Sequence, residues 1–140
     1  MTEETFHLFD HTADLGIEFF GRTQAELFVH GALALTSQIT DPDAITPALE
    51  KCIVVEGMDR TDLLINYLRE VLFLINGTGF LPRTIRIDVL QKRRLRATLH
   101  GELFRAGKHR IHKEIKAVTY HQASIVKTTG GWKGRVIFDV

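Results

Sequence analysis

The amino-acid sequence predicts an α+β fold in which two amphipathic helices pack on a largely antiparallel β-sheet. In the first half of the chain, apolar residues recur at helical spacing in two segments, whereas the second half alternates apolar and polar residues with a period of two. Helices followed by a run of strands are typical of α+β proteins. The length of 140 residues, with 44% apolar and 25% charged residues, predicts one domain over residues 1–140.

The first strand and the first helix are predicted from the segment before residue 44. Residues 15–20 alternate apolar and polar side chains, as a strand with one buried face does. Residues 24–39 then predict an amphipathic helix that begins at Thr23, the first residue of a Thr-Gln-Ala-Glu capping box. Asp41-Pro42-Asp43 is expected to end it.

A second strand and a second helix follow. Residues 52–56 predict the strand, and we expect Cys52 to be a small buried hydrophobe at its start. Asp59 or Thr61 can cap the next helix, which the sequence Asn76-Gly77-Thr78-Gly79 is expected to end.

The chain after Pro82 predicts strands alone, because short apolar segments with period-two alternation recur there. Gly130-Gly131 is a turn signal between the last two of these segments and indicates a hairpin. The predicted strands cover residues 85–89, 95–99, 115–120, 124–128 and 136–139.

The composition excludes several kinds of protein. A single cysteine excludes an internal disulfide and a zinc site built from paired cysteines. No apolar stretch approaches the roughly 20 residues that span a bilayer, so we expect no membrane contact. The acidic start of the chain does not resemble a signal peptide, and we expect a cytoplasmic protein.

The net charge of +1 hides an asymmetry between the two halves. Residues 1–70 hold four basic and thirteen acidic side chains, whereas residues 71–140 hold fourteen basic and four acidic ones. Either the halves neutralise each other in the fold, or they leave a basic face for an acidic partner or nucleic acid.

Carboxylates near both ends of the chain are candidates for a metal or acid–base site. The segment Asp10-His11-Thr12-Ala13-Asp14 holds two carboxylates and an imidazole within five residues. Asp139 precedes the terminal carboxylate of Val140, and such oxygen ligands suit Ca²⁺, Mg²⁺ or Mn²⁺. The alternative is structural: these side chains could only hydrogen-bond a turn or lie exposed at a strand end.

A basic segment at residues 108–116 could bind phosphate. It contains Lys113 and Lys116, and a solvated loop explains the same composition. A second basic stretch, Arg93-Arg94-Leu95-Arg96, could face RNA or a protein partner.

Several segments, in this order, resemble the archease family. Phe9-Asp-His-Thr-Ala-Asp-Leu-Gly-Ile17, with the helix start Thr23-Gln-Ala-Glu-Leu-Phe28, is similar to the family's opening signature. Residues 62–70 resemble its second helix, residues 114–120 its late strand, and residues 138–140 its ending.

The resemblance implies a function. Archeases are protein cofactors, not enzymes, of the GTP- and manganese-dependent RNA-splicing ligase that joins ends bearing a 3′-phosphate or 2′,3′-cyclic phosphate. They promote guanylylation of the ligase histidine and multiple turnover in tRNA splicing. A divalent metal ion and this ligase, with tRNA reached through it, are therefore the expected cofactor and partners.

The resemblance also implies site residues. The family's metal ligands fall on Asp14, Asp139 and Val140. Its functional lysine falls on Lys116 or on the nearby Lys113, and His11 is a further candidate for contact with a partner or phosphate.

Two other functions are alternatives. A stand-alone metal-dependent phosphoesterase could use Asp10, Asp14 and Asp139, although these carboxylates are few for a two-metal site. An RNA-binding or chaperone module for tRNA processing could use the basic second half, although that half has few aromatic residues for base stacking.

Overall fold

The structure is a computed structural model that describes residues 4–11 and 14–140, without the side chains of Asp10 and His11. In chain order its elements are β1 (Phe6–His11), β2 (Asp14–Gly21), α1 (Gln24–Ile39), the short 3₁₀ helix η1 (Pro42–Ala44), β3 (Leu49–Glu56), α2 (Arg60–Thr78), β4 (Phe80–Leu90), β5 (Arg94–Leu103), β6 (Ala117–Thr128) and β7 (Gly131–Asp139).

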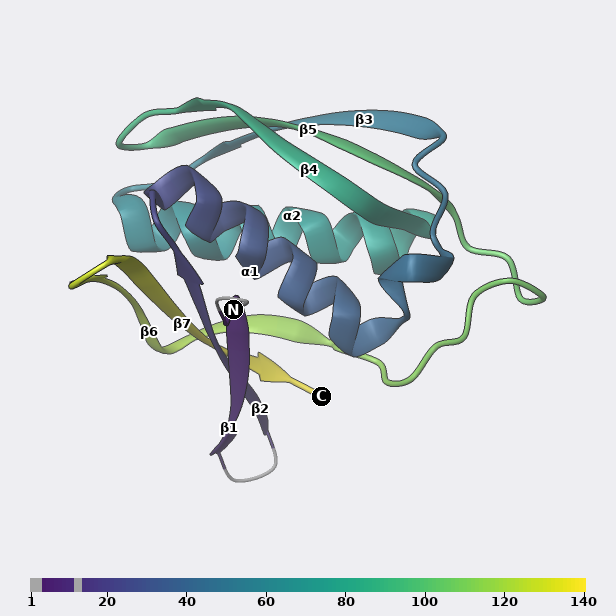
Figure 1. Cartoon of the computed structure of the whole chain (residues 1–140), viewed down its shortest axis with the longest axis horizontal. Coiled ribbons are helices and arrows are strands. Elements are labelled where there is room, and N and C mark those ends of the chain that lie inside the picture. Colours follow the sequence, from purple (N-terminus) through teal and green to yellow (C-terminus); the bar gives the residue numbers. More distant parts are fainter. Residues whose placement is uncertain (1–3, 12–13) are drawn as a thin grey trace.

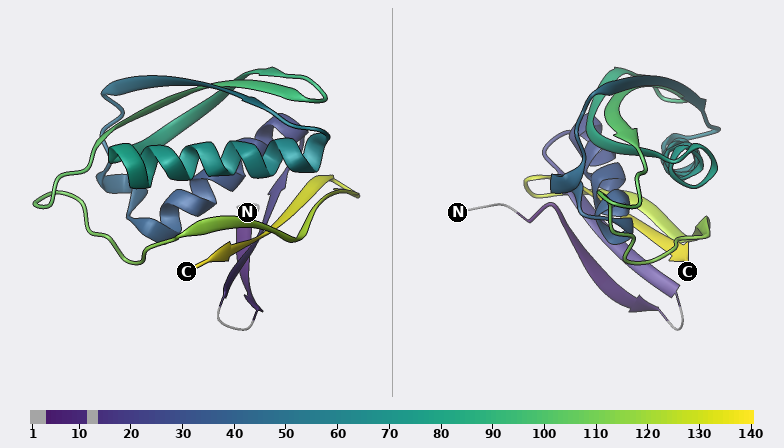
Figure 2. Two further views of the ribbon diagram at one scale, coloured as in Figure 1. Left: turned by 180° about the vertical axis from the view of Figure 1, so that it is seen from behind. Right: turned by 90° about the vertical axis from the view of Figure 1, so that its right-hand side faces the viewer.

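The two helices form a layer between two antiparallel sheets (Figures 1 and 2). The four-stranded sheet has the order β1-β2-β7-β6, and the three-stranded sheet has the order β3-β5-β4. Helix α1 packs against β2 and β4, and α2 packs against β6 and β3, so each helix contacts both sheets. The predicted α+β class is confirmed, and the strands are divided between two sheets.

The first helix begins as its sequence predicts. The Thr23 hydroxyl accepts a hydrogen bond from the Glu26 N–H at 3.1 Å, while the Glu26 carboxylate accepts one from the Arg22 N–H at 3.0 Å. The Thr23 hydroxyl thus satisfies one N–H that the helix leaves without an internal partner, and Glu26 reaches back to the residue before the cap.

The second helix begins at a predicted cap and ends within the predicted stop segment. The Asp59 carboxylate accepts from the Asp62 N–H at 2.8 Å. The segment Asn76-Gly77-Thr78 continues the helix, and the end is at Gly79, whose φ of 76° gives the left-handed C-terminal cap. The predicted stop, Asn76-Gly77-Thr78-Gly79, therefore contains the end of the helix, and within it only the second glycine adopts the conformation that stops a helix.

The core lies on both faces of the helix layer. The Phe28 and Tyr67 rings, one from each helix, are fully buried with their centres 5.4 Å apart. The expectation that Cys52 is buried was wrong: it lies exposed on the outward face of β3. Ile53 and Val55 take the inward positions of that strand, so the intervening residues face solvent.

Within the described part of the chain, no helix is both long and apolar enough to cross a membrane.

The buried Tyr67 hydroxyl predicts a stabilising substitution. It has no hydrogen-bond partner among the described residues, and burial raises its pKa. Because an unpaired buried hydroxyl is destabilising, Tyr67→Phe is expected to raise the free energy of unfolding by about 1 kcal/mol. Urea titration checks this. Tyr120→Phe is the matched control and should lower it, because the Tyr120 hydroxyl donates to Asp62 at 2.6 Å. A loss of stability in Tyr67→Phe would contradict the expectation.

Candidate functional site

Strand pairing brings the two candidate metal-ligating aspartates to one end of the four-stranded sheet. On β2, Leu15 lies opposite Phe138 of β7, and continuing this register by one residue places Asp14 beside Asp139. On the other side of β2, Asp14 lies opposite His11 of β1. The His11 side chain lies outside the described residues, as does that of Asp10. The backbone therefore brings together candidate residues from the two ends of the chain.

The two carboxylates share the outward face of this sheet. Leu15 and Phe138 point into the core, so the alternation of side chains turns Asp14 and Asp139 outward. Opposite side chains on antiparallel strands have Cβ atoms about 5 Å apart, and like charges at this spacing repel one another. Two carboxylates at this spacing can share a hard divalent cation.

The donor chemistry fits such a cation. Carboxylate oxygens are the ligands that Ca²⁺, Mg²⁺ and Mn²⁺ prefer, and the adjacent Val140 is partly exposed. Among the side chains that the structure describes, no three from His, Cys, Asp or Glu form a metal-ligand group. The aspartate pair therefore suits an ion that takes its other ligands from outside these side chains.

Lys116 lies next to this pair, and Lys113 does not. The Lys116 N–H donates to the Asp139 carbonyl oxygen at 2.7 Å, and Ala117 then pairs with Asp139 as β6 begins. Lys113 is exposed in the preceding connection. The Lys116 side chain lines a shallow groove of about 300 Å³ against α2, whereas the aspartates face outward. The Lys116 amine thus lies on the helix side of the sheet end, and the Asp14 and Asp139 carboxylates lie on its outward side.

Contacts from α2 fix the start of β6. Arg69 donates twice to the Val118 carbonyl oxygen, at 3.2 and 3.1 Å, and its guanidinium lies 4.6 Å from the centre of the Tyr120 ring. Asn76 donates to the Ile115 carbonyl oxygen at 2.9 Å. Sequence reasoning missed both supporting residues, since their partners are backbone atoms of a distant strand.

A charged cluster stabilises the outward face beside the aspartates. The Glu18 carboxylate accepts from His7 at 2.5 Å and from Arg135 at 3.1 Å, and the Arg135 guanidinium stacks 3.8 Å from the centre of the Phe9 ring. Burial opposes ionisation of Glu18, but the hydrogen bonds from His7 and Arg135 outweigh it and lower its pKa. These contacts join β1, β2 and β7, and so hold the aspartate row in register.

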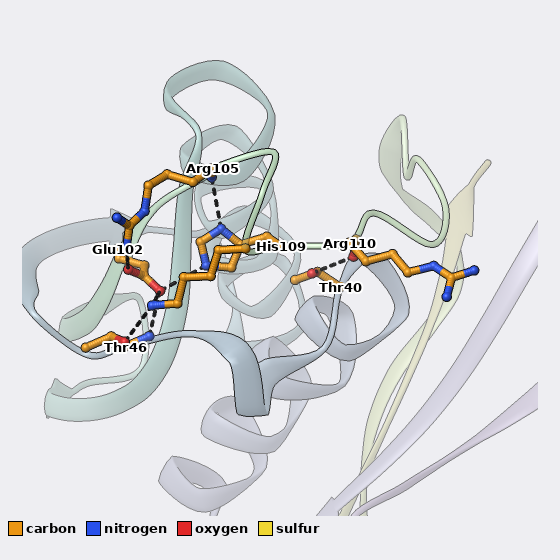
Figure 3. A network of polar contacts seen from close by, with 7 residues as sticks. Thr40, Thr46, Glu102, Arg105, His109 and Arg110 are labelled. Atoms are coloured by element: carbon orange, nitrogen blue, oxygen red, sulfur yellow. Dashed lines mark hydrogen bonds and ion pairs between the residues drawn. The ribbon is translucent and has the colours of Figure 1, made fainter.

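The connection from β5 to β6 is anchored at its start by the buried Glu102 (Figure 3). One carboxylate oxygen accepts from the Thr46 N–H at 2.8 Å, from Lys108 at 2.6 Å and from His109 at 2.9 Å. The other accepts from Arg105 at 3.1 Å. Lys108 and the Thr46 N–H outweigh the effect of burial and, with His109, hold the pKa of Glu102 well below its ordinary value.

His109 is buried in a neutral form within this network. Its Nδ1 accepts from the Arg105 N–H at 2.9 Å, so the ring proton is on Nε2, which donates to Glu102. Further along, the Thr40 hydroxyl donates to the Arg110 carbonyl oxygen at 2.7 Å, as Figure 3 also shows. His112 then contacts Asp41 at 2.8 Å. These anchors hold the long connection that ends at Lys116.

The chain is similar to one known protein family over almost its whole length. Residues 6–140 match the model of the Archease protein family (MTH1598/TM1083). Protein archease of Methanosarcina barkeri is 32% identical over 139 residues, which cover 96% of this chain and 95% of the relative. Protein archease of Pyrococcus furiosus is 35% identical over 136 residues, which cover 94% of this chain and 96% of the relative.

Two solved structures share the fold. The solution structure of Methanobacterium thermoautotrophicum protein 1598 matches with a TM-score of 0.81 and 32% identity, covering 97% of this chain and 99% of that one. The crystal structure of an "archease, possible chaperone" from Thermotoga maritima matches with a TM-score of 0.65 and 24% identity, covering 94% of each chain. At that identity the second match shows the fold alone.

The Glu102 network predicts a pH dependence of stability. The pKa of Glu102 is lower in the folded state than its ordinary value of 4.5, so the unfolded chain binds more protons in acid than the folded chain does. The stabilisation is therefore present above pH 4.5 and is lost as the pH falls below it. Urea titrations from pH 7 to pH 3 should show a steeper loss for wild type than for Glu102→Gln. Parallel curves would contradict the account.

Proposed function

The chain belongs to the archease family, and from this premise we propose that it is a protein cofactor of the GTP-dependent RNA ligase that joins 3′-phosphate ends. In this proposal it promotes guanylylation of the ligase histidine and repeated turnover, and it has no ligase activity itself. It acts in the cytoplasm on the ligase and reaches tRNA through it. The observation that carries the proposal is the row formed by Asp14, Asp139 and the Lys116 backbone at one sheet end.

The exposure of this sheet end suits action on another macromolecule. Asp139, Val140 and Lys116 are all exposed, and the groove beside Lys116 is shallow. An end of this kind can approach the active site of a partner enzyme. The β2–β7 pairing and the contacts from α2 fix its backbone beforehand, so little conformational freedom is lost on binding.

The two kinds of charge have separate tasks in the proposed complex. Asp14 and Asp139 would hold a divalent ion, which when bound supplies positive charge against nucleotide phosphates. Lys116 would donate a charge-assisted hydrogen bond to a phosphate oxygen or to a ligase carboxylate. Neither Lys116 nor Asp139 forms an ion pair within the described part of the chain, so both charges are available.

Direct assay of the ligase tests the function. With GTP and Mn²⁺, substoichiometric wild-type protein is expected to accelerate guanylylation of the ligase histidine, because each molecule acts on many ligase molecules. Radiolabelled GTP incorporation gives the rate. The protein alone, assayed on a phosphoester with Mg²⁺ or Mn²⁺, is the control for a stand-alone phosphoesterase. Unchanged guanylylation with both proteins folded would refute the proposal.

The two lysines can be separated by a matched pair of variants. Lys116→Ala is expected to reduce the acceleration about tenfold or more, because a lost hydrogen bond to a charged group is worth about 1.5–3 kcal/mol. Lys113→Ala removes the same charge from a residue that does not contact Asp139 and should stay within about twofold of wild type. The reverse order of effects would assign the role to Lys113.

A further inference from the structure

The turn of the β4–β5 hairpin and the start of β5 carry a dense group of cations. Four basic residues fall within five consecutive positions, and all four are exposed: Lys92, Arg93, Arg94 and Arg96. No hydrogen bond or ion pair joins the first three side chains to any residue in the part of the chain that the structure describes. We call residues 91–96 the basic hairpin.

The backbone of the basic hairpin is fixed. The Gln91 N–H donates to the Arg94 carbonyl oxygen at 2.8 Å and closes the turn. The Gly57 N–H donates to the Arg93 carbonyl oxygen at 2.9 Å and ties the turn to the β3–α2 connection. Cations on a fixed backbone lose less conformational freedom on binding than cations on a flexible tail.

Nearby carboxylates neutralise this group only in part. Asp88 is already held by Arg86 at 2.6 Å and by the Thr98 hydroxyl at 2.5 Å. Glu56 lies opposite Arg94 in the strand register and is the other acidic residue of these rows. Consecutive residues of an extended chain are about 3.3 Å apart along it, so neighbouring charges of this group lie within a Debye length of about 8–10 Å and their fields add.

We infer that the basic hairpin binds the phosphate backbone of RNA. Arginine guanidiniums present forked donors that match phosphate oxygens, and such contacts position nucleic acid without reading its sequence. The choice of RNA as the polyanion rests on the proposed function. Figures 1 and 2 show the three-stranded sheet on the opposite side of the helices from the C-terminus. RNA held at the hairpin therefore leaves the Asp139 end open to the ligase.

Titration of labelled tRNA transcript with the full-length protein tests the inference. Fluorescence anisotropy at several KCl concentrations should give a slope of log K against log salt of about −3 for four phosphate contacts. Arg93→Glu combined with Arg94→Glu is expected to weaken binding about tenfold or more near 0.1 M KCl, and to make the slope shallower by about 2. An unrelated tRNA should bind with similar affinity, because the contacts are to the backbone.

A charge-matched variant provides the control. Lys51→Glu with Lys127→Glu makes the same change in net charge at two exposed residues outside the basic hairpin. It should stay within about threefold of wild type. Equal losses in the two double variants, or no RNA binding by wild type at low salt, would overturn the inference.

Guanylylation without RNA separates this inference from the proposed function. The Arg93/Arg94 variant should accelerate ligase guanylylation as wild type does, because that step needs no RNA. Loss of acceleration in this variant would show that the hairpin contacts the ligase and would overturn the RNA assignment. If wild type itself fails to accelerate guanylylation, the proposed function fails, while the RNA titration still decides what the hairpin binds.

Discussion

The register of β2 against β7 is the constraint on which the rest of the site depends. It pairs Ile17 with Val136 and Leu15 with Phe138, four side chains that are buried against the helices. Burial of each such side chain contributes about 1.5–3 kcal/mol. A slip of one residue would turn the buried pair of the shifted strand to solvent, so the register is strongly specified. The position of Asp14 beside Asp139 follows from the core, not from any attraction between the two carboxylates.

The lysine side of the site depends on a different set of contacts. The β6 strand is at the edge of its sheet, and α2 satisfies part of its free edge through Arg69 and Asn76. The long connection before β6 is held by Glu102 and by the contact between Thr40 and Arg110. Core packing thus positions the carboxylates, whereas buried polar contacts position Lys116. Acid should therefore disturb the position of Lys116 and that of the two carboxylates to different extents.

Local sequence signals predicted the elements well, because each signal acts within a few residues. The Thr23 cap and the bounds of α1 follow from spacing and hydrogen-bonding chemistry alone. Cys52 was misplaced because Val54, next but one along β3, is also apolar, so the strand shows two candidate inward faces. Only the pairing of β3 with β5 decides between them. The division of the strands into two sheets is likewise set by contacts between distant segments.

The candidate site was predictable as a set of residues but not as an arrangement. Asp14, Asp139 and Val140 came from a resemblance, and their role as metal ligands remains a prediction. The adjacency of the aspartates requires the register of strands more than 100 residues apart. The charge asymmetry between the two halves has a partial structural explanation, because acidic Glu56 and basic Arg94 meet across β3 and β5. Part of the remaining excess of cations lies at the basic hairpin.

A double-mutant cycle on Asp14 and Asp139 tests the central claim most directly. The measured quantity is the acceleration of ligase guanylylation by wild type, Asp14→Asn, Asp139→Asn and the double variant, each shown to be folded by circular dichroism. If the β2–β7 register makes the two carboxylates one site, each single variant loses most of the acceleration and the double variant loses little more. Additive losses, or wild-type acceleration by either single variant, would show that the aspartates do not act together.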